Sequence, residues 1–300
     1  MDPSEEARSL VELGLTRDQS TALRGLALEG GGLILFVGPL GSGKTTTIYS
    51  LLSSVADRSR SVVTVEDPIE HKIPFARQQE VGPNASFRAL LQQAIHDRPD
   101  ILFLSEVKDL TSAQACVEFV RKGHLAVASM NSSNAATAVF RLERLGVDRS
   151  AVADVLIGVV AQRLIRRLCP ECKETRPITP KESALLEPFT EDPPLALSHP
   201  VGCPACRETG YQGQVGLFEV IRVGPRMSEL VRDGRPIAEL RDFAQGRGDL
   251  LVGDHGLEKL RGLKVALKDL YKEVLLEESA VVNLEEEGRG RAVGVADRPG

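Results

Sequence analysis

The chain has 300 residues, of which 42% are hydrophobic, and it carries a formal net charge of −5. This length allows one large or two moderate domains with real cores, and the acidic balance excludes the general basic field that nucleic-acid-binding proteins use. No apolar stretch approaches the roughly 18–20 uncharged residues that span a bilayer, and the acidic first residues, MDPSEEARSL, lack the apolar core of a signal peptide. We therefore expect a soluble, intracellular protein.

The first strong motif lies between a predicted strand and a predicted helix. Residues 33–37 read LILFV, as expected for a strand that is buried on both faces of a parallel sheet. Residues 38–45 read GPLGSGKT and match the phosphate-binding loop pattern in full. A helical face follows, formed by Ile48, Leu51, Leu52 and Val55. A chance glycine-rich turn is the alternative, and these flanks disfavour it.

This motif predicts a nucleotide site. Its glycines let successive N–H groups and the helix N-terminus face an anion. Lys44 would neutralise the β- and γ-phosphates, and the Thr45 hydroxyl would ligate Mg²⁺. The predicted ATP-binding residues are Gly38, Pro39, Leu40, Gly41, Ser42, Gly43, Lys44, Thr45 and Thr46.

Strands and helices alternate after the loop. Strands are predicted at residues 61–65, 101–104 and 125–130. Helices are predicted at about 87–96 behind Ser86, after Thr111, and from Asn134 to Gly146. This alternation implies an α/β fold with a parallel sheet and helices on both faces, so residues 1–150 are taken as a nucleotide-binding domain.

Strand-end acids complete the predicted catalytic inventory. A phosphate-loop enzyme needs an acid at the end of a neighbouring strand to hold Mg²⁺ and polarise water. Glu106 follows the strand at 101–104, and Glu66 and Asp67 end the strand at 61–65. Each could instead be an ordinary strand-end or capping acid. With Lys44, the candidate catalytic residues are Glu106 and Glu66.

The second half of the chain has a different pattern. A buried helix is predicted from Val152 to about Arg167, and helices return from about Pro225. Residues 151–284 are taken as a mainly helical region with an insert at 169–206, and residues 285–300 as a disordered tail.

The insert carries two C-P-x-C pairs, Cys169 with Cys172 and Cys203 with Cys206. Four thiolates at this spacing suit a tetrahedral structural zinc site. Two unrelated cysteine pairs, one of them redox-active, are the alternative. The lone Cys116 falls on an apolar helix face and is expected in the core.

Together these motifs resemble the ATPases that drive type II secretion and type IV pilus assembly. The resemblance runs from about Leu13 to about Leu276, through GPLGSGKTTTIYSLL, TVEDPIEH, RPDILFLSEVKD, GHLAVAS, AQRLIRRLCPECK, GCPACRETGYQGQVGLFEV and DHGLEKLRGL. It implies a RecA-like core that uses ATP and Mg²⁺, with Zn²⁺ in the insert. It also implies a hexameric ring in the cytoplasm, peripheral to the inner membrane, where a platform protein is the partner. Pilus-retraction motors lack the tetracysteine insert, which favours assembly or secretion.

The chain departs from the family pattern around the nucleotide. Four positions lack a family arginine: Gln92, His96, Lys108 and Gln214. Asn131 stands in place of a histidine, and Ser105 and Val107 in place of Gly and Ile. The resemblance begins after the family's N-terminal domain, which supplies further arginines, so a separate subunit would have to provide that domain.

Two functions therefore compete. The first is a slow but genuine motor ATPase, which the retained Lys44, Thr45, Glu66 and Glu106 favour. The second is a hydrolysis-deficient, nucleotide-binding paralogue with a regulatory or structural role. An arginine that stabilises transition-state charge is worth ~10³–10⁵ in rate. We therefore expect ATP binding with weak hydrolysis.

Overall fold

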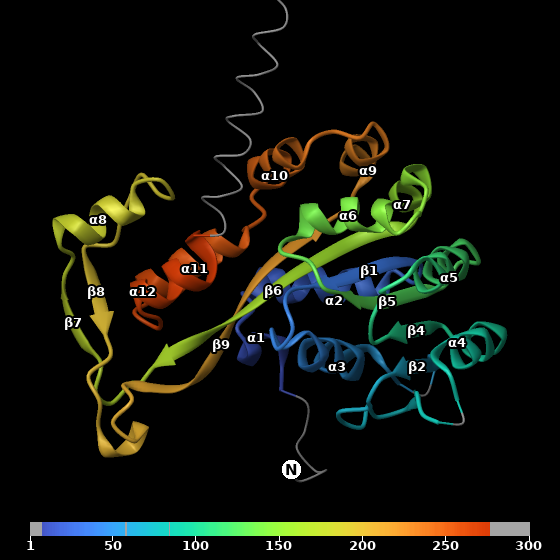
Figure 1. Cartoon of the computed structure of the whole chain (residues 1–300), viewed down its shortest axis with the longest axis horizontal. Helices are drawn as coiled ribbons and strands as arrows, with labels where there is room; N and C mark the ends of the chain where they lie inside the picture. The colour runs from blue at the N-terminus through green and yellow to red at the C-terminus, as the bar shows by residue number, and fades with distance from the viewer. Residues whose placement is uncertain (1–7, 58, 84, 277–300) are drawn as a thin grey trace, which may run out of the picture. The chain divides into compact units, whose positions relative to one another are not determined.

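The computed structural model describes residues 8–57, 59–83 and 85–276, and its contacts divide the chain into two compact units (Figure 1). The first unit comprises the chain up to Arg163 together with Phe218–Leu251. The second comprises Leu164–Leu217 and the chain from Val252 onward. The chain therefore passes between the units within two long strands, β6 (Leu156–Leu168) and β9 (Tyr211–Arg222), and once more near residue 251.

A seven-stranded sheet forms the framework, in the order β3–β2–β4–β5–β1–β6–β9. Its other strands are β1 (Gly32–Val37), β2 (Val62–Glu66), β3 (Ala76–Glu80), β4 (Ile101–Leu104) and β5 (Leu125–Met130). Parallel pairing joins β3 to β6 through the sheet, as predicted. β9 runs opposite to β6, because Cys169 N donates to Gly210 O near one end and Val223 N to Ile157 O near the other.

Helices on both faces bury the central strands, which explains their continuous apolar sequences. Every residue of β1, β2, β4 and β5 is buried. Ile34 and Phe36 of β1 join a core with α1 (Leu10–Leu13), α2 (Arg17–Leu28) and α3 (Lys44–Val55). On the opposite side of β1 in Figure 1 lies α5 (Leu110–Arg121). The fold class expected from the alternating pattern is confirmed.

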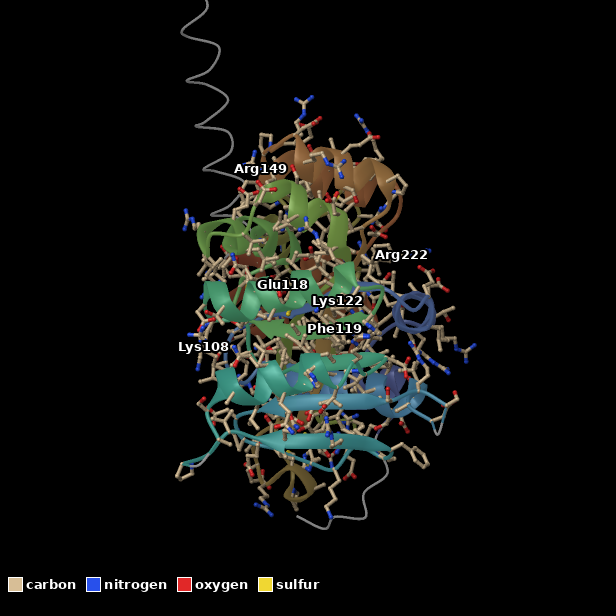
Figure 2. The ribbon with its side chains drawn as sticks, turned by 90° about the vertical axis from the view of Figure 1, so that its right-hand side faces the viewer. Lys108, Glu118, Phe119, Lys122, Arg149 and Arg222 are labelled. Atoms are coloured by element: carbon tan, nitrogen blue, oxygen red, sulfur yellow. The ribbon has the colours of Figure 1, made fainter. Side chains whose placement is uncertain are left out.

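α5 shows how one helix divides between core and solvent. Phe119 is fully buried and stacks on the His124 ring at 4.9 Å, whereas Glu118 and the C-cap residue Lys122 are exposed; Figure 2 labels these three residues of α5 and its end. Cys116 is also buried in α5, as expected. The helix begins earlier than predicted, because Asp109 rather than Thr111 is its N-cap and accepts a hydrogen bond from Ser112 N.

Five further helices belong to the first unit. They are α4 (Phe87–His96), α6 (Ala135–Arg144), α7 (Arg149–Val155), α9 (Pro225–Arg232) and α10 (Ile237–Gly246). The predicted N-caps of α4 and α6 are confirmed: Ser86 accepts from Ala89 N, and Asn134 accepts from Thr137 N. Such side-chain acceptors satisfy amide groups that would otherwise lack a partner at a helix start.

The predicted helix from Val152 to Arg167 is wrong. The helix α7 ends at Val155, and β6 follows it directly. A short apolar run fits both the period of a helix and the period of a strand. Here the β-branched residues and the pairing with β1 favour the strand. Gly158 permits this packing, because a Cβ on it would lie 2.6 Å from a methyl carbon of Leu26.

The second unit contains the insert and the last described helices. Strands β7 (Glu174–Pro177) and β8 (Ala196–His199) form a separate antiparallel pair, with α8 (Pro180–Leu186) between them in sequence. A 3-10 turn, η1 (Pro204–Cys206), contains Cys206, and Cys203 is its N-cap. The remaining elements are α11 (Val252–Arg261), α12 (Leu267–Leu270) and a π turn, η2 (Tyr271–Leu275).

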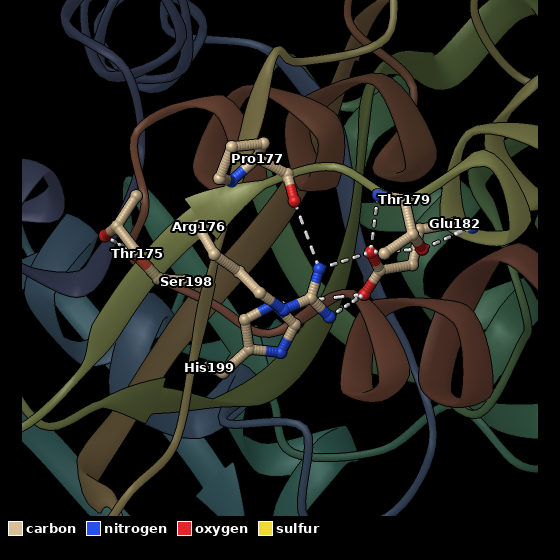
Figure 3. Close-up of polar contacts among 7 residues, drawn as sticks. All are labelled: Thr175, Arg176, Pro177, Thr179, Glu182, Ser198 and His199. Carbon is tan, nitrogen blue, oxygen red and sulfur yellow. Dashed lines mark hydrogen bonds and ion pairs between the residues drawn. The ribbon is translucent and has the colours of Figure 1, made fainter.

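An ion pair ties β7 to α8 (Figure 3). The guanidinium of Arg176 donates to both carboxylate oxygens of Glu182 at 2.9 and 2.8 Å, and the Thr179 hydroxyl donates to the same carboxylate. Thr179 Oγ1 also caps α8 by accepting from Glu182 N. The Arg176 hydrogen bond is the main cause that lowers the pKa of Glu182 to about 2. Local ion pairing of this kind lets a segment with few buried apolar side chains hold a fixed shape.

The predicted tail at 285–300 lies outside the described residues. Among the residues that are described, no helix has the length and apolar character that crossing a bilayer would require.

Candidate nucleotide-binding site

The loop at residues 38–45 joins the central strand β1 to α3, as the motif predicts. β1 has β5 on one side and β6 on the other, so the loop leaves the sheet at the carboxyl end of its middle strands. α3 starts at Lys44, and its N-cap Gly43 has φ of +84° and offers no side-chain acceptor. The first amides of α3 are therefore available to an anion.

Gly38 is required by its surroundings. Its φ is +154°, and a Cβ on it would lie 2.4 Å from the Gln162 carbonyl oxygen and 2.6 Å from Ser42 Oγ. Gly41 also has a positive φ, of +76°, but a Cβ there would meet nothing within 4 Å. Gly38 therefore lets the loop pass close to β6, whereas Gly41 serves only the turn itself.

A pocket of about 350 Å³ opens over the loop. The loop from Leu40 to Thr46 lines it, together with Glu66 from β2 and Glu106 from the segment after β4. Gly38 and Pro39 contribute through their carbonyl oxygens, which both accept hydrogen bonds from Lys44 Nζ at 2.9 Å. The structure thus brings the predicted loop residues and both predicted catalytic carboxylates to one place.

Lys44 is half-buried beside charged neighbours. Burial is the largest cause that lowers the pKa of Lys44, Glu106 opposes this effect, and Arg163 of β6 adds to it. A cation that is partly desolvated, and held only by two carbonyl oxygens, is well prepared to exchange them for phosphate oxygens.

The two carboxylates differ in their environments. The Glu106 side chain is exposed to the pocket, and its backbone is fixed by hydrogen bonds from Ser105 N to Val65 O and from Val107 N to Ser129 O. Glu66 is 0% exposed and accepts hydrogen bonds from three neighbouring side chains. Glu106 can therefore reach a solvent molecule in the pocket, whereas Glu66 is held in one orientation.

Sequence reasoning missed several residues around the pocket. Glu70 and Phe87 line it without having been predicted. Lys108, which the sequence analysis names as a departure from the family and which is labelled in Figure 2, also lines it and places its Nζ 6.0 Å from the Phe87 ring centre. Tyr49 and Gln78 contact Glu66 without a motif that marks them. His96, where the resemblance predicts an arginine, is 90% exposed on α4.

The second unit contains a candidate metal centre. The Sγ atoms of Cys169, Cys172, Cys203 and Cys206 all lie within 4.8 Å of one another. Three of their separations are 3.9, 3.8 and 3.7 Å. A zinc ion with Zn–S bonds of about 2.3 Å in tetrahedral geometry requires S–S edges of about 3.8 Å. The four thiols therefore fit this ion.

Backbone amides surround these sulfur atoms. Gly202 N donates to Cys172 Sγ at 3.3 Å, and Cys203 N and Gly210 N donate to Cys206 Sγ at 3.2 Å. Although burial acts to raise it, the amides of Cys203 and Gly210 help to hold the pKa of Cys206 at about 6, whereas burial raises the pKa of Cys172 to about 12. Donors aimed at sulfur stabilise thiolates, which is the form that binds a metal.

The chain is similar in sequence to known secretion and pilus proteins. The model of a family described as "Type II/IV secretion system protein" matches residues 1–273. The type II secretion system ATPase E of Vibrio cholerae is 32% identical over 274 residues, which cover 91% of this chain and 54% of that protein. The type IV pilus assembly ATPase PilB of Acinetobacter baylyi is 32% identical, covering 91% and 48%. The chain thus spans about half the length of these relatives.

Solved structures show the same fold at lower identity. The pilus retraction motor PilT with bound ADP has a TM-score of 0.67 at 21% identity, covering 91% of this chain and 68% of that one. The Legionella pneumophila ATPase DotB has a TM-score of 0.63 at 17% identity, covering 88% and 64%.

Proposed function

The chain belongs to the type II/IV secretion system protein family, and we propose that it binds Mg-ATP and hydrolyses it slowly as a motor component of a type II secretion or type IV pilus assembly system. The observation that carries this proposal is the pocket in which the loop from Leu40 to Thr46, Glu66 and Glu106 meet. The named relatives are secretion and pilus ATPases, which supports the same activity for this chain.

Each residue has a role in this proposal. The loop amides and the N-terminus of α3 hold the phosphates, and Lys44 exchanges its two carbonyl contacts for β- and γ-phosphate oxygens. The Thr45 hydroxyl ligates Mg²⁺, which neutralises phosphate charge when it is bound. Glu106, exposed in the pocket, aligns the attacking water.

Slow turnover is expected from the resemblance to the family. Positions 92, 96 and 214 carry Gln, His and Gln where the family has arginine. An arginine that stabilises transition-state charge is worth ~10³–10⁵ in rate, whereas binding depends on the loop amides and Lys44, which remain. Complete loss of hydrolysis, in a regulatory or structural paralogue, is the second candidate, and these substitutions favour it.

The insert and the assembly complete the proposal. Cys169, Cys172, Cys203 and Cys206 hold one structural zinc ion, which the sulfur geometry supports. The chain forms a homo-oligomer, a hexameric ring as in the family, in the cytoplasm at the inner membrane. There it acts on a membrane platform protein, and no nucleic acid is a partner.

Titration with Mg-ATP tests the proposal. Calorimetry should show specific binding, and Lys44→Ala should weaken it by tenfold or more, because the variant removes a charge-assisted contact worth about 1.5–3 kcal/mol. Light scattering during the same titration should show growth from monomer towards a ring. Absence of binding, or binding that Lys44→Ala leaves unchanged, would overturn the assignment of the loop as the nucleotide site. A chain that stays strictly monomeric at saturating Mg-ATP would overturn the proposed ring.

A further inference from the structure

The Glu66 carboxylate is enclosed by hydrogen-bond donors from three elements. Tyr49 of α3 donates its phenolic O–H to Oε2. Thr64 Oγ1 of β2 donates to Oε1 at 2.6 Å, and Gln78 Nε2 of β3 donates to the same oxygen at 3.0 Å. An ionised carboxylate offers about four acceptor sites. Three are thus occupied, and about one remains for the pocket that Glu66 lines.

Tyr49 contributes more than one contact to this enclosure. Its hydroxyl oxygen accepts a hydrogen bond from Glu70 N at 3.2 Å, so one side chain joins Glu66 to the pocket-lining segment that follows it. Its ring packs edge-on against Phe103 of β4 and His71, with centres 6.3 and 6.1 Å apart. Burial, and then Glu66, raise the pKa of Tyr49, so the phenol keeps its proton and acts as a donor.

Gln78 of β3 binds the same segment, residues 67–73, through its side-chain amide. Its amide nitrogen also donates to His71 O at 2.8 Å, and its Oε1 accepts from Ile73 N at 2.8 Å. The residues after Glu66 are therefore fastened both to α3, the helix that begins at the phosphate-binding loop, and to β3, the edge strand of the sheet.

We propose that Tyr49 is a positioning residue, which fixes the Glu66 carboxylate at the edge of the pocket and couples the segment at residues 67–73 to the phosphate-binding helix. This inference rests on the proposed ATPase activity for its kinetic consequence. With the Mg-nucleotide bound, the remaining acceptor site of Glu66 would orient a ligand of the metal at the edge of the pocket. The exposed carboxylate of Glu106 would take up the proton of the attacking water. Tyr49 acts only through Glu66 and the segment that follows.

Tyr49→Phe tests this role, because it removes the hydroxyl and leaves the ring in its packing. The expected result is a kcat about tenfold lower with an unchanged KM for ATP, which corresponds to about 1.4 kcal/mol at 1.36 kcal/mol per decade. Amide hydrogen exchange at Glu70 should become faster, since its N–H loses its acceptor.

Tyr211→Phe is the matched control. Tyr211 also donates its hydroxyl to a buried carboxylate, Asp269 Oδ2 at 2.7 Å, but it does not line the pocket. Both variants should lower the melting temperature, and only Tyr49→Phe should lower kcat. A kcat that stays within twofold of wild type in Tyr49→Phe, or that falls equally in both variants, overturns the positioning role.

The two proposals fail in different ways. A wild-type chain without any turnover would overturn the proposed hydrolysis. In that case amide hydrogen exchange at Glu70 would by itself test the role of Tyr49. A faster exchange rate in Tyr49→Phe, but not in Tyr211→Phe, supports the coupling of the segment at residues 67–73 to α3. An unchanged rate overturns it.

Discussion

At the scale of single residues, chemically identical side chains have different environments in this site. Glu66 is the last residue of β2 and Glu106 lies two residues after β4, and nothing in their local sequence separates them. The structure does, because Glu66 is 0% exposed among three donors, whereas Glu106 lies exposed in the pocket. The donors Tyr49 and Gln78 come from elements distant in sequence, so only the fold reveals the difference.

The two loop glycines give a prediction at the same scale. Gly38→Ala should reduce Mg-ATP affinity by tenfold or more, because the new Cβ would lie 2.4 Å from the Gln162 carbonyl oxygen and the loop must move. Gly41→Ala meets open space and carries only the backbone cost of a left-handed residue, about 1–2 kcal/mol, so its affinity should stay closer to wild type. Calorimetry on both variants measures this. Equal losses would mean that contact with β6 does not shape the loop.

At the scale of elements, predictability depended on how strong the local signals were. The strands at 101–104 and 125–130 and the helix at 87–96 were predicted at their observed bounds, because buried parallel strands read as apolar runs and Ser86 marks the helix start. β6 was missed because an apolar run that follows a short helix fits both the helical period and the strand period. β3, with the sequence ARQQE at the sheet edge, has no apolar pattern to detect.

The insert gives the element-scale prediction. Protein purified without chelator should contain about one zinc ion per chain by elemental analysis, since the sulfur atoms fit a tetrahedral site. Cys206→Ser should lower this content and destabilise the insert, because binding of structural zinc contributes ~10–16 kcal/mol of apparent folding energy. Cys116→Ser is the control, since Cys116 is buried in α5 of the other unit. Zinc content well under one per chain in the wild type would overturn the metal assignment.

At the scale of the whole molecule, the sequence indicated the sheet and the pocket but not the division of the chain. The sequence analysis takes Phe218–Leu251 as part of the region at 151–284, yet these residues return to the unit that holds the nucleotide site. β6 and β9 make this return possible, because each is long enough to belong to both units. Contacts between segments so far apart in sequence leave no local pattern.

The central claim is that the chain holds Mg-ATP well and turns it over slowly. Steady-state hydrolysis at saturating Mg-ATP, measured on the wild type and on Glu106→Gln beside their affinities, tests it most directly. The account predicts a low but measurable wild-type rate, below about 1 s⁻¹, the lower end of typical enzyme values. Glu106→Gln should abolish that rate and leave affinity nearly unchanged, because it removes the water-aligning carboxylate and no phosphate contact. Turnover typical of a full motor, or residual turnover indifferent to Glu106→Gln, would contradict the account.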